Sequence, residues 1–413
     1  MNLEIILVND ASTDKSGVLC DAFAEKHKNV KVIHNKKNQG VSHSRNTGLK
    51  TAVGCYVIFL DSDDYILNNG LAGVEEVIRD ANYPDIVVIE KFLTRREPDS
   101  FTIHKLFDNS ISSSGTPDEV IKNFNDLKNF YGTCWCYIVK RDVVGQNQLI
   151  FTPHISFAED QEFVAKLFCV SKSFGFYKGT FYCKRTSSGA LTQKLDYDTA
   201  FACLKVVNGL CEFIKANNFS GVKREFLFAR IQSPLAQFVP QLISLDREGV
   251  SRLSKNIDSS FKSLELLEDV SDDFNLLSFT KKFGSYDGLR LYRQSVVKEI
   301  MLLLEEIGYE ELYIFSKNIS GKAVARLIIN EGYPVKGILD NDETVAGTFY
   351  SGLEVSLPRI LQGRTVDEIA KVSVLICNQH KDSIDSIYKQ LYDIGLQSKR
   401  IIHKTFHPHG ATI

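Results

Sequence analysis

Residues 55–64 read CYVIFLDSDD, an apolar run that ends directly in an acidic group. A continuous apolar run of this length is typical of a β-strand that is covered on both faces. The acidic group contains Asp61 and Asp63, so two carboxylates follow the strand with one residue between them. The sequence therefore predicts a buried strand whose carboxyl end carries acidic side chains.

Strand-like and helix-like segments alternate on both sides of this run. The expected strands are 3–8, 30–34, 55–60 and 85–90, separated by expected helices that end near 27, 52 and 80. Such a β-α-β-α-β alternation predicts an α/β fold on a mostly parallel sheet with right-handed crossovers.

The rest of the chain divides by pattern into further parts. Residues 101–115 are polar and rich in Ser and Asp, which predicts a loop. Long helical patterns fill much of 197–307, and strand-helix alternation returns from 311 onward. We therefore expect three parts, an α/β core over 1–192, a helical region over 193–308 and a second α/β domain over 309–413.

The composition is that of a globular protein with little net charge. Of the 413 residues, 49 are Lys or Arg and 51 are Asp or Glu, giving a formal net charge of −2. A nearly neutral chain lacks the broad positive field that holds nucleic acid, so we expect no nucleic-acid partner. Nine scattered cysteines in a chain of this length favour reduced thiols in the cytoplasm over disulfide bonds.

Membrane association is predicted to be peripheral at most. No run approaches the ~18 apolar residues that a membrane span requires, and the N-terminus shows no signal-peptide pattern. Docking on the inner face of a membrane and assembly into a homo-oligomer are both compatible with the sequence.

Asp61 and Asp63 could together bind a divalent cation. Ligands of open parallel sheets bind outside the carboxyl ends of the strands. Mg²⁺ and Mn²⁺ prefer carboxylate oxygens and leave positions for diphosphate oxygens, whose developing charge they offset. The alternative is a strand-to-helix turn, where Asp and Ser are common caps, and this motif alone favours the cap.

Two further residues point to the same sheet edge. Asp10 follows the first strand and could accept hydrogen bonds from a nucleobase or ribose, although it too could be a cap. Arg45 lies on the expected helix 42–52 and could hold a diphosphate, although a solvated helix arginine explains it equally well in isolation. Two acidic strand ends in one sheet are less easily explained as two independent caps.

A third acidic segment reads AEDQEF over 158–163. Asp160, with Glu159 beside it, could be the general base that removes a proton from a hydroxyl group. The alternative is an acidic first turn that complements the helix dipole. Spacing alone does not separate these two interpretations.

Four segments together carry a resemblance to a known family. They are EIILVNDASTD (4–14), GVSHSRNTGLKTAVGCYVIFLDSDDYI (40–66), FAEDQEF (157–163) and YCKRTSSGALT (182–192). In order and composition they resemble the inverting, GT-A-fold glycosyltransferases of family 2, which include many bacterial polysaccharide and cell-wall enzymes. The resemblance covers roughly residues 2 to 192 and implies a sugar transferase with a metal-binding Asp-Ser-Asp motif.

The resemblance implies a role for each matching residue on the donor side. Asp10 would bind the uracil or ribose, and Arg45 would lie near the diphosphate of a nucleotide-sugar, which we expect to be a UDP-sugar. Asp61 and Asp63 would hold ribose and a Mg²⁺ or Mn²⁺ ion, with Asp63 the direct ligand. Arg185 would belong to a mobile loop that closes over the diphosphate.

On the acceptor side the resemblance implies single-step displacement with inversion. Asp160 would be the base, with Glu159 beside it, and the acceptor would be a hydroxyl of a glycan or polyol-phosphate polymer. Trp135 occupies the place of a family Trp near the acceptor, although a lone Trp is more often part of a core.

The family pattern normally opens with one more strand and helix, a unit of roughly 30 residues. Here Met1 directly precedes the strand that is usually second. The resemblance then implies a truncated core that lacks part of its donor site, so we expect low activity from the chain as given. An alternative function is an inactive remnant that serves as a binding or assembly module, although the intact Asp61, Asp63 and Asp160 speak against it.

Residues 312–342 read LYIFSKNISGKAVARLIINEGYPVKGILDND and resemble Rossmann-like nucleotide-binding halves. The resemblance would place glycines at Ser316, Asn318 and Gly321, but only Gly321 is one, and side chains at the other two would crowd a pyrophosphate. Asp340 falls where a ribose-binding acid would. We therefore expect a nucleotide-free Rossmann-like module for assembly or acceptor placement, and an NAD-dependent enzyme is disfavoured.

Overall fold

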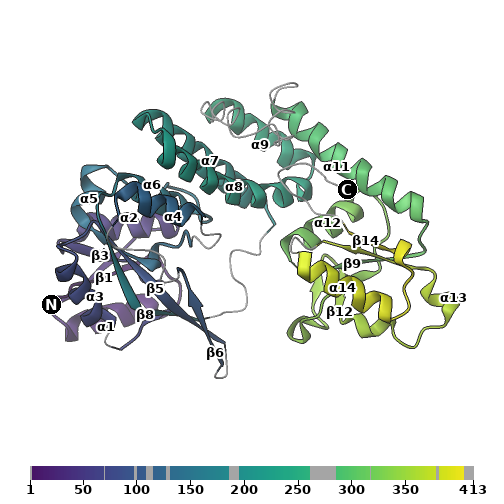
Figure 1. The fold of residues 1–413 in the computed structure, drawn as a ribbon, viewed down its shortest axis with the longest axis horizontal. Helices are drawn as coiled ribbons and strands as arrows, with labels where there is room; N and C mark the ends of the chain where they lie inside the picture. The colour runs from purple at the N-terminus through teal and green to yellow at the C-terminus, as the bar shows by residue number, and fades with distance from the viewer. Residues whose placement is uncertain are drawn as a thin grey trace. The chain divides into compact units, whose positions relative to one another are not determined.

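The computed structural model of the chain confirms an α/β fold (Figure 1). It describes residues 2–68, 70–96, 100–107, 115–126, 131–185, 195–260, 285–316, 318–377 and 381–403. The chain forms two compact units, Met1–Leu191 with Gly209–Ile231, and Thr192–Asn208 with Gln232–Ile413.

The first unit opens with a short parallel sheet. Strand β1 (Ile5–Asn9) pairs in parallel with β2 (Val30–His34), and helix α1 (Ser16–Lys26) connects them. Helix α2 (Val41–Thr51) follows β2. These elements lie within a few residues of their predicted bounds because β-branched strands and helical periodicity are local signals.

The larger sheet of this unit has the strand order β3-β7-β5-β8-β4, with β6 paired to β5. Its strands are β3 (Tyr56–Ile58), β4 (Tyr65–Ile66), β5 (Ile86–Arg96), β6 (Ser100–Lys105), β7 (Tyr137–Lys140) and β8 (Phe174–Arg185). Within the described part of the chain only β5 and β8 pair in parallel, and the other ladders of this sheet are antiparallel.

This pairing differs from the single, mostly parallel sheet that the alternation predicted. Strand β3 pairs with β7, which comes from much later in the chain and runs the opposite way. Strands β1 and β2 form a sheet of their own, and no ladder joins β1 to β3 in the described part of the chain. Local patterns do not specify long-range strand neighbours.

The predicted loop over 101–115 is wrong in its first half. Residues Ser100–Lys105 form β6, an edge strand that pairs antiparallel with β5. Its side chains are mostly exposed, so a polar composition is compatible with a strand at this edge. The ring of His104 stacks on Phe92 across the pair at 4.7 Å. Residues 108–114 lie outside the described part.

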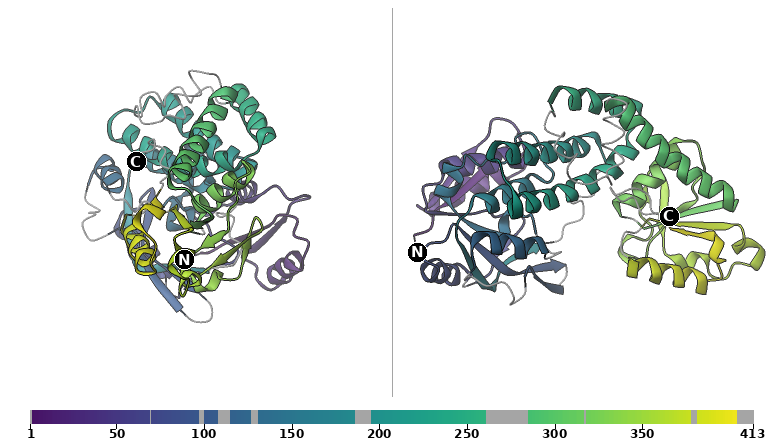
Figure 2. Two further views of the ribbon diagram at one scale, coloured as in Figure 1. Left: turned by 90° about the vertical axis from the view of Figure 1, so that its right-hand side faces the viewer. Right: turned by 45° about the horizontal axis from the view of Figure 1, so that its top comes forward.

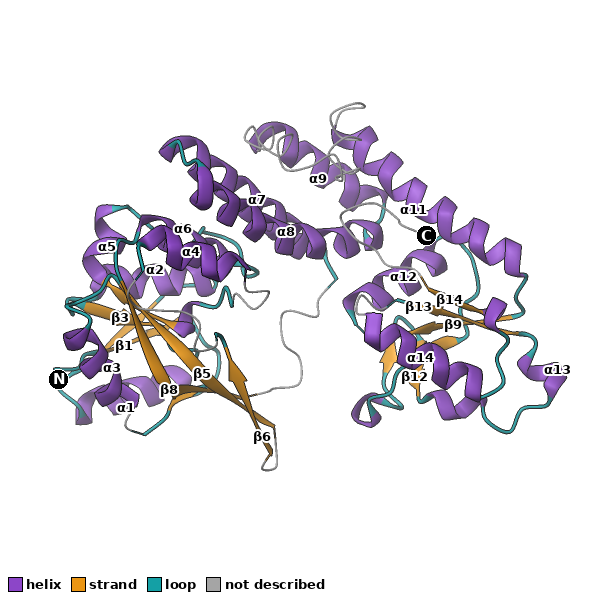
Figure 3. Cartoon of the chain, in the orientation of Figure 1, coloured by secondary structure: helices purple, strands orange, loops and turns teal. Residues whose placement is uncertain are grey.

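Further helices belong to the first unit. They are α3 (Gly70–Asp80), α4 (Pro117–Asp126), α5 (Arg141–Gln146), α6 (Glu159–Val170) and the 3₁₀ turn η1 (Cys134–Cys136). Helix α6 contributes two aromatic side chains to the core of this unit. Phe163 stacks on Phe151 at 4.2 Å, and Phe168 meets Phe124 edge to face at 5.2 Å. In Figure 3 α2, α4, α5 and α6 are drawn above the strands of this unit.

Long helices follow the first α/β region, as predicted. They are α7 (Tyr197–Asn217), α8 (Gly221–Ser244), α9 (Arg247–Ser260) and α11 (Ser285–Ile307). Helices α7 and α8 supply residues to both compact units, so the boundary between units does not coincide with the ends of helices. The three-part division predicted from the sequence stays a prediction.

The C-terminal sheet has the order β11-β12-β10-β9-β13-β14, and every ladder except β11–β12 is parallel. Its strands are β9 (Glu311–Phe315), β10 (Gly337–Leu339), β11 (Phe349–Tyr350), β12 (Leu353–Ser356), β13 (Val372–Ile376) and β14 (Ile401–His403). The chain leaves β9 toward β10 and later returns to its other side with β13, which is the doubly wound order of Rossmann-like folds.

Helices cover both faces of this sheet (Figure 2). They are α12 (Ile319–Asn330), α13 (Val366–Ile369) and α14 (Lys381–Asp393), with 3₁₀ turns η4 (Glu343–Val345), η5 (Pro358–Leu361) and η6 (Ser398–Arg400). Ile387 and Leu391 of α14 share one buried cluster with Tyr313 and Phe315 of β9. Since side chains alternate along a strand, the other face of β9 is left for α12.

Candidate active site

Arg45 joins two of the predicted acidic segments. Its side chain is only 12% exposed, and its two terminal nitrogens bind Asp61 Oδ1 at 2.9 Å and Glu159 Oε1 at 2.8 Å. The guanidinium also lies over the ring of Phe151, 5.3 Å from its centroid. The structure therefore brings together Arg45, Asp61 and Glu159, which are far apart in the sequence.

Helix α2 is held in place by the side chains of Ser42 and Asn46, which lie on either side of Arg45 in the sequence. Ser42 donates from Oγ to the carbonyl of Ile155 at 2.9 Å. Asn46 donates to the carbonyl of Phe151 at 2.8 Å and accepts from its N–H at 2.9 Å. Positions i and i+4 share one face of a helix, so this face fixes α2 against the segment that leads into α6.

Asp10 holds the start of α2. Its carboxylate accepts hydrogen bonds from the N–H groups of Gln39 and Gly40, the latter at 2.7 Å, and from the side chain of Asn35 at 2.7 Å. Burial alone would raise the pKa of Asp10, but these hydrogen bonds lower it below its usual value. The structure links Asp10 to the Arg45 helix through the backbone N–H of Gly40, which directly precedes α2. Its predicted role at a uracil or ribose stays a prediction.

Glu159 and Asp160 begin α6. The preceding residue, Ala158, has a left-handed backbone with φ 59, an uncommon conformation for a residue with a Cβ. Strained backbone of this kind often lies near functional sites.

The pKa of Asp160 is raised to about 7, first by burial and then by the negative charge of Glu159. Burial also raises the pKa of Glu159, and the charge of Arg45 opposes this. A carboxyl group with a pKa near neutrality can exchange a proton at physiological pH.

The Asp61–Asp64 turn is fixed by Tyr182 of β8. The Tyr182 hydroxyl donates to Asp64 Oδ2 at 2.7 Å and accepts from the N–H of Asp61 at 3.1 Å. The N–H of Asp64 donates to the carbonyl of Asp61 at 3.1 Å, closing the turn. Burial raises the pKa of Asp64. The side chain of Asp63 is exposed at the tip of this turn.

Arg185 lies beside the same turn. Its N–H donates to Asp64 Oδ1 at 2.8 Å, and its guanidinium Nε donates to the carbonyl of Asp63. Arg185 is thus next to the acidic turn, and its predicted place in a loop that closes over the diphosphate stays a prediction. Residues 186–194, where a closing loop was predicted, lie outside the described part.

Trp135 is part of the aromatic core. It is 4% exposed, stacks on Tyr182 at 4.4 Å with an interplanar angle of 11°, and meets Phe92 edge to face. The ring therefore supports the tyrosine that fixes the acidic turn. Its predicted contact with an acceptor stays a prediction.

The residues at the turn fit a hard divalent cation that is shared with a ligand. Asp63 is exposed and Asp61 is 35% exposed, and carboxylate oxygens are the donors that Mg²⁺ and Mn²⁺ prefer. Within the described residues no group of three or more His, Cys, Asp or Glu could hold a metal alone. A metal here would therefore need further oxygens from a ligand or water.

Sequence reasoning missed Tyr182 and Asp64 and assigned no role to Asn46. Tyr182 lies 121 positions after Asp61 in the sequence, and no spacing rule connects the two residues. The signal that could have drawn attention to Asn46 was its place beside Arg45, on the face that also carries Ser42.

Comparisons with known proteins find relatives of the N-terminal part of the chain. Residues 1–147 match the model of the family described as Glycosyl transferase family 2. The uncharacterized glycosyltransferase EpsJ of Bacillus subtilis (strain 168) is 29% identical over 192 residues, which are 46% of this chain and 55% of EpsJ. The minor teichoic acid biosynthesis protein GgaB of the same organism is 31% identical over 182 residues, 44% of this chain and 19% of GgaB.

These relatives are matched over about half of EpsJ and a fifth of GgaB. Among solved structures, S. aureus TarS 1–349 in complex with UDP-GlcNAc has a TM-score of 0.48 and 18% identity, covering 72% of this chain and 83% of that one. Among the described residues no helix is both long and apolar enough to cross a membrane.

Proposed function

Because the N-terminal part of this chain is a family 2 glycosyltransferase domain of the GT-A type, we propose that it transfers a sugar, with inversion, from a nucleotide-sugar to a hydroxyl group. The donor is a UDP-sugar, and the acceptor is a glycan or polyol-phosphate polymer of the cell surface. The name of GgaB, a teichoic acid biosynthesis protein, supports the acceptor class.

The observation that carries this proposal is the Arg45 bridge between Asp61 and Glu159. It brings the acidic turn to the start of α6, so that a cation at Asp63 and a proton acceptor at Asp160 can serve one substrate.

In the proposed reaction Asp160 accepts the proton of the acceptor hydroxyl. The hydroxyl oxygen forms a bond to the anomeric carbon of the sugar, and the bond from that carbon to the diphosphate oxygen breaks on the opposite face. The electron pair of the broken bond leaves with the nucleoside diphosphate. Arg45 contributes a fixed positive charge near the diphosphate.

Asp61 and Asp63 would hold a Mg²⁺ or Mn²⁺ ion, with Asp63 the direct ligand. When bound, the ion offsets the negative charge that develops on the leaving diphosphate. Arg185, beside the same turn, would add a second positive charge. Action at the inner face of the membrane, as a peripheral protein, stays a prediction.

Calorimetry with UDP and Mn²⁺, followed by UDP release from a panel of UDP-sugars, tests this proposal. We expect Mn²⁺-dependent UDP binding that Asp63→Asn abolishes. Asp160→Asn should keep UDP binding but lower the transfer rate by about 10²-fold or more. Asp142→Asn, an exposed carboxylate on α5 with a side chain 65% exposed, is the matched control and should change neither quantity. No UDP binding would contradict the proposal and favour a non-catalytic binding or assembly module.

A further inference from the structure

We propose that the C-terminal unit has a second binding site, specific for an uncharged sugar or another polyhydroxylated compound without phosphate. The site is a cavity at the carboxyl edge of the doubly wound sheet. It lies within one unit and does not depend on the transferase activity proposed above.

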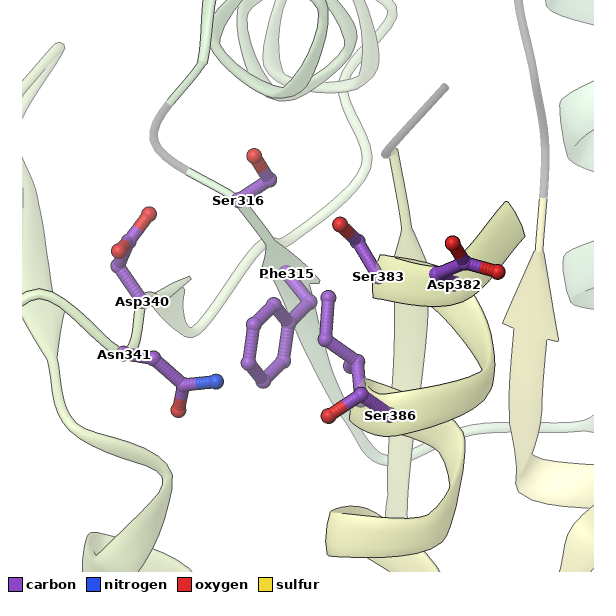
Figure 4. A pocket seen from close by; sticks show the side chains of 8 residues that line it. Phe315, Ser316, Asp340, Asn341, Asp382, Ser383 and Ser386 are labelled. Carbon is purple, nitrogen blue, oxygen red and sulfur yellow. The ribbon is translucent and has the colours of Figure 1, made fainter. Parts of the chain in front are cut away.

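The cavity has a volume of about 400 Å³ (Figure 4). It lies between the ends of β9 and β10 and the first turns of α14. Its lining residues are Phe315, Ser316, Asp340, Asn341, Asp382, Ser383, Ser386 and Ile387. Small-molecule sites in proteins have volumes of roughly 300–1,000 Å³, so a monosaccharide has room here.

The position in the fold is one where ligands bind. Strand β9 has β10 on one side and β13 on the other, and the chain winds outward in both directions. In open α/β sheets ligands occupy the crevice at the carboxyl ends of the strands beside such a switch point. Phe315 and Ser316 come from the end of β9, and Asp340 follows β10.

The helix N-terminus that would bind a pyrophosphate in this fold is capped by a side chain of the protein itself. The side chain of Asn318 accepts from the N–H of Gly321 at 2.8 Å and donates to the carbonyl of Cys377 at 3.1 Å. This side chain therefore caps the α12 N-terminus, where the backbone N–H groups of dinucleotide-binding folds meet phosphate. Ser316 adds a side chain at a position with φ 105, where glycine is the usual residue.

The lining is also unsuited to an anion. Among the described residues it contains the carboxylates Asp340 and Asp382 and no Lys or Arg, so a phosphate would meet the negative charge of these two groups. The Asp340 carboxylate is oriented by the N–H of Asp342, which donates to it at 2.9 Å.

The same lining matches the hydroxyl groups of a sugar. Carboxylates accept hydrogen bonds from neighbouring hydroxyls, and Ser and Asn side chains both donate and accept. Phe315 and Ile387 supply apolar surface for the C–H groups of a ring. A metal ion is the weaker alternative, since no group of three potential ligands is present among the described residues.

Saturation-transfer NMR on the full chain, with EDTA present, tests the site. The uncharged probes are N-acetylglucosamine, ribitol and uridine, and the charged probes are UDP and NAD⁺. We expect at least one uncharged probe to bind with a Kd on the order of 1 mM. Asp340→Asn and Asp382→Asn should each weaken this binding about tenfold.

Two control variants make the outcome specific. Asp385→Asn, an exposed acid on the same helix outside the lining, should leave binding unchanged. Asp63→Asn should also leave it unchanged, which separates this site from the proposed donor site.

The proposal is overturned if no uncharged probe binds, if neither lining variant weakens binding, or if UDP or NAD⁺ binds more tightly than the uncharged probes and a lining variant changes that binding. Asp382 is exposed on the first turn of α14, so Asp382→Asn keeps the test valid if Asp340→Asn fails to fold.

Discussion

At the scale of single residues, Arg45 is already satisfied before any ligand arrives. It is mostly buried and pairs with both Asp61 and Glu159. Removing one partner of a buried ion pair costs about 3–5 kcal/mol because the other charge is left unpaired. If a metal ion binds Asp61, Arg45 loses part of its ion pairing with that carboxylate. A bound diphosphate can replace the lost pairing by binding the arginine. The geometry thus favours joint binding of metal and nucleotide.

The raised pKa of Asp160 predicts the pH dependence of the reaction. Asp160 must lose its proton to act as a base, so the rate should rise with pH through about 7 and level off above it. The same shift has the opposite effect on stability. The neutral form of Asp160 is favoured in the fold, so its contribution is fully present below the unfolded pKa of about 3.9 and is lost as pH rises through about 7.

Glu159→Gln provides a matched check on this prediction. Its negative charge is the second cause of the raised pKa of Asp160, so its removal should move the rising limb of the rate profile to lower pH. Steady-state rates between about pH 5 and 9 measure the limb. A rate that is independent of pH across this range would rule out Asp160 as the base.

Tyr182→Phe should weaken metal binding with little effect on turnover. The variant keeps the ring that stacks on Trp135 but loses the hydroxyl that connects Asp61 and Asp64. Residues that orient metal ligands typically change affinity by about 10–100-fold, so the Mn²⁺ concentration for half-maximal activity should rise about tenfold. Turnover at saturating Mn²⁺ should be nearly unchanged.

Tyr177→Phe is the control for that experiment. Tyr177 lies on the same strand and contacts Phe181, and within the described residues no hydrogen bond joins it to the acidic turn. It should leave the Mn²⁺ dependence unaltered. An equal rise in both variants would indicate a general effect on β8 and would exclude a specific role for the Tyr182 hydroxyl.

At the scale of secondary-structure elements, α2 is the element that assembles the site. Asp10 fixes its first turn, and Ser42 and Asn46 fix its inner face. The helix carries Arg45 between these fixed points. The position of the Arg45 guanidinium therefore depends on hydrogen bonds to Asp10, which follows β1, and to the segment before α6.

Asp10→Asn should destabilise the protein by about 1–2 kcal/mol at neutral pH, because the neutral amide accepts weaker hydrogen bonds than the carboxylate. The pKa of Asp10 is lowered in the fold. Its stabilisation is therefore present above the usual Asp pKa and is lost as pH falls through the folded value.

Urea unfolding of Asp10→Asn and of the parent should thus differ at neutral pH and converge in acid. Asp80→Asn, an exposed acid at the end of α3, serves as the comparison and should resemble the parent at both pH values. A difference that persisted undiminished in acid would mean that Asp10 acts through shape and not through charge.

Two substitutions in the strand-to-helix turn after β9 should change the stability of the protein in opposite directions. Ser316→Gly should stabilise the protein by up to about 1 kcal/mol, because φ 105 is unfavourable for a residue with a Cβ. Gly321→Ala should destabilise it by several kcal/mol, about 3 or more, because an added Cβ would lie 2.0 Å from the Ser316 carbonyl oxygen.

Thermal unfolding measures both changes at the β9 turn. Gly145→Ala is the control, since a Cβ added there meets no atom within 4 Å. A stable Gly321→Ala protein would show that the β9–α12 turn differs from the one described.

At the scale of the whole molecule, each of the two compact units has its own candidate site. The first contains the acidic turn and Arg45, and the second contains the cavity between β9 and α14. With a net charge of −2, neither site is served by a strong overall field. Selectivity must come from local groups.

UDP with Mn²⁺ should therefore protect one unit only. At a ligand concentration about 100 times Kd, binding stabilises the state that binds by about 2.7 kcal/mol. Hydrogen exchange should slow in α2 and in residues 61–64, and strands β9 to β14 should keep their rates. Asp63→Asn should remove the protection. Uniform slowing throughout the chain would contradict separate sites.

The sequence by itself determined the elements and the residue types of this protein. Strand β2 and helix α3 have their predicted bounds, because hydrophobic periodicity and capping residues act over a few positions. The acids at 61, 63 and 160 were recognisable by their places after a strand and at the start of a helix. The α/β class of both ends of the chain followed from the same local signals.

Only the tertiary structure decided which elements are neighbours. It paired β3 with β7, placed β6 where a loop was expected, and brought Tyr182 to the acidic turn. It also buried Asp160 beside Glu159 and so raised the pKa of Asp160. Burial and charge at a site depend on contacts between distant segments, and those contacts arise from the packing of the whole chain.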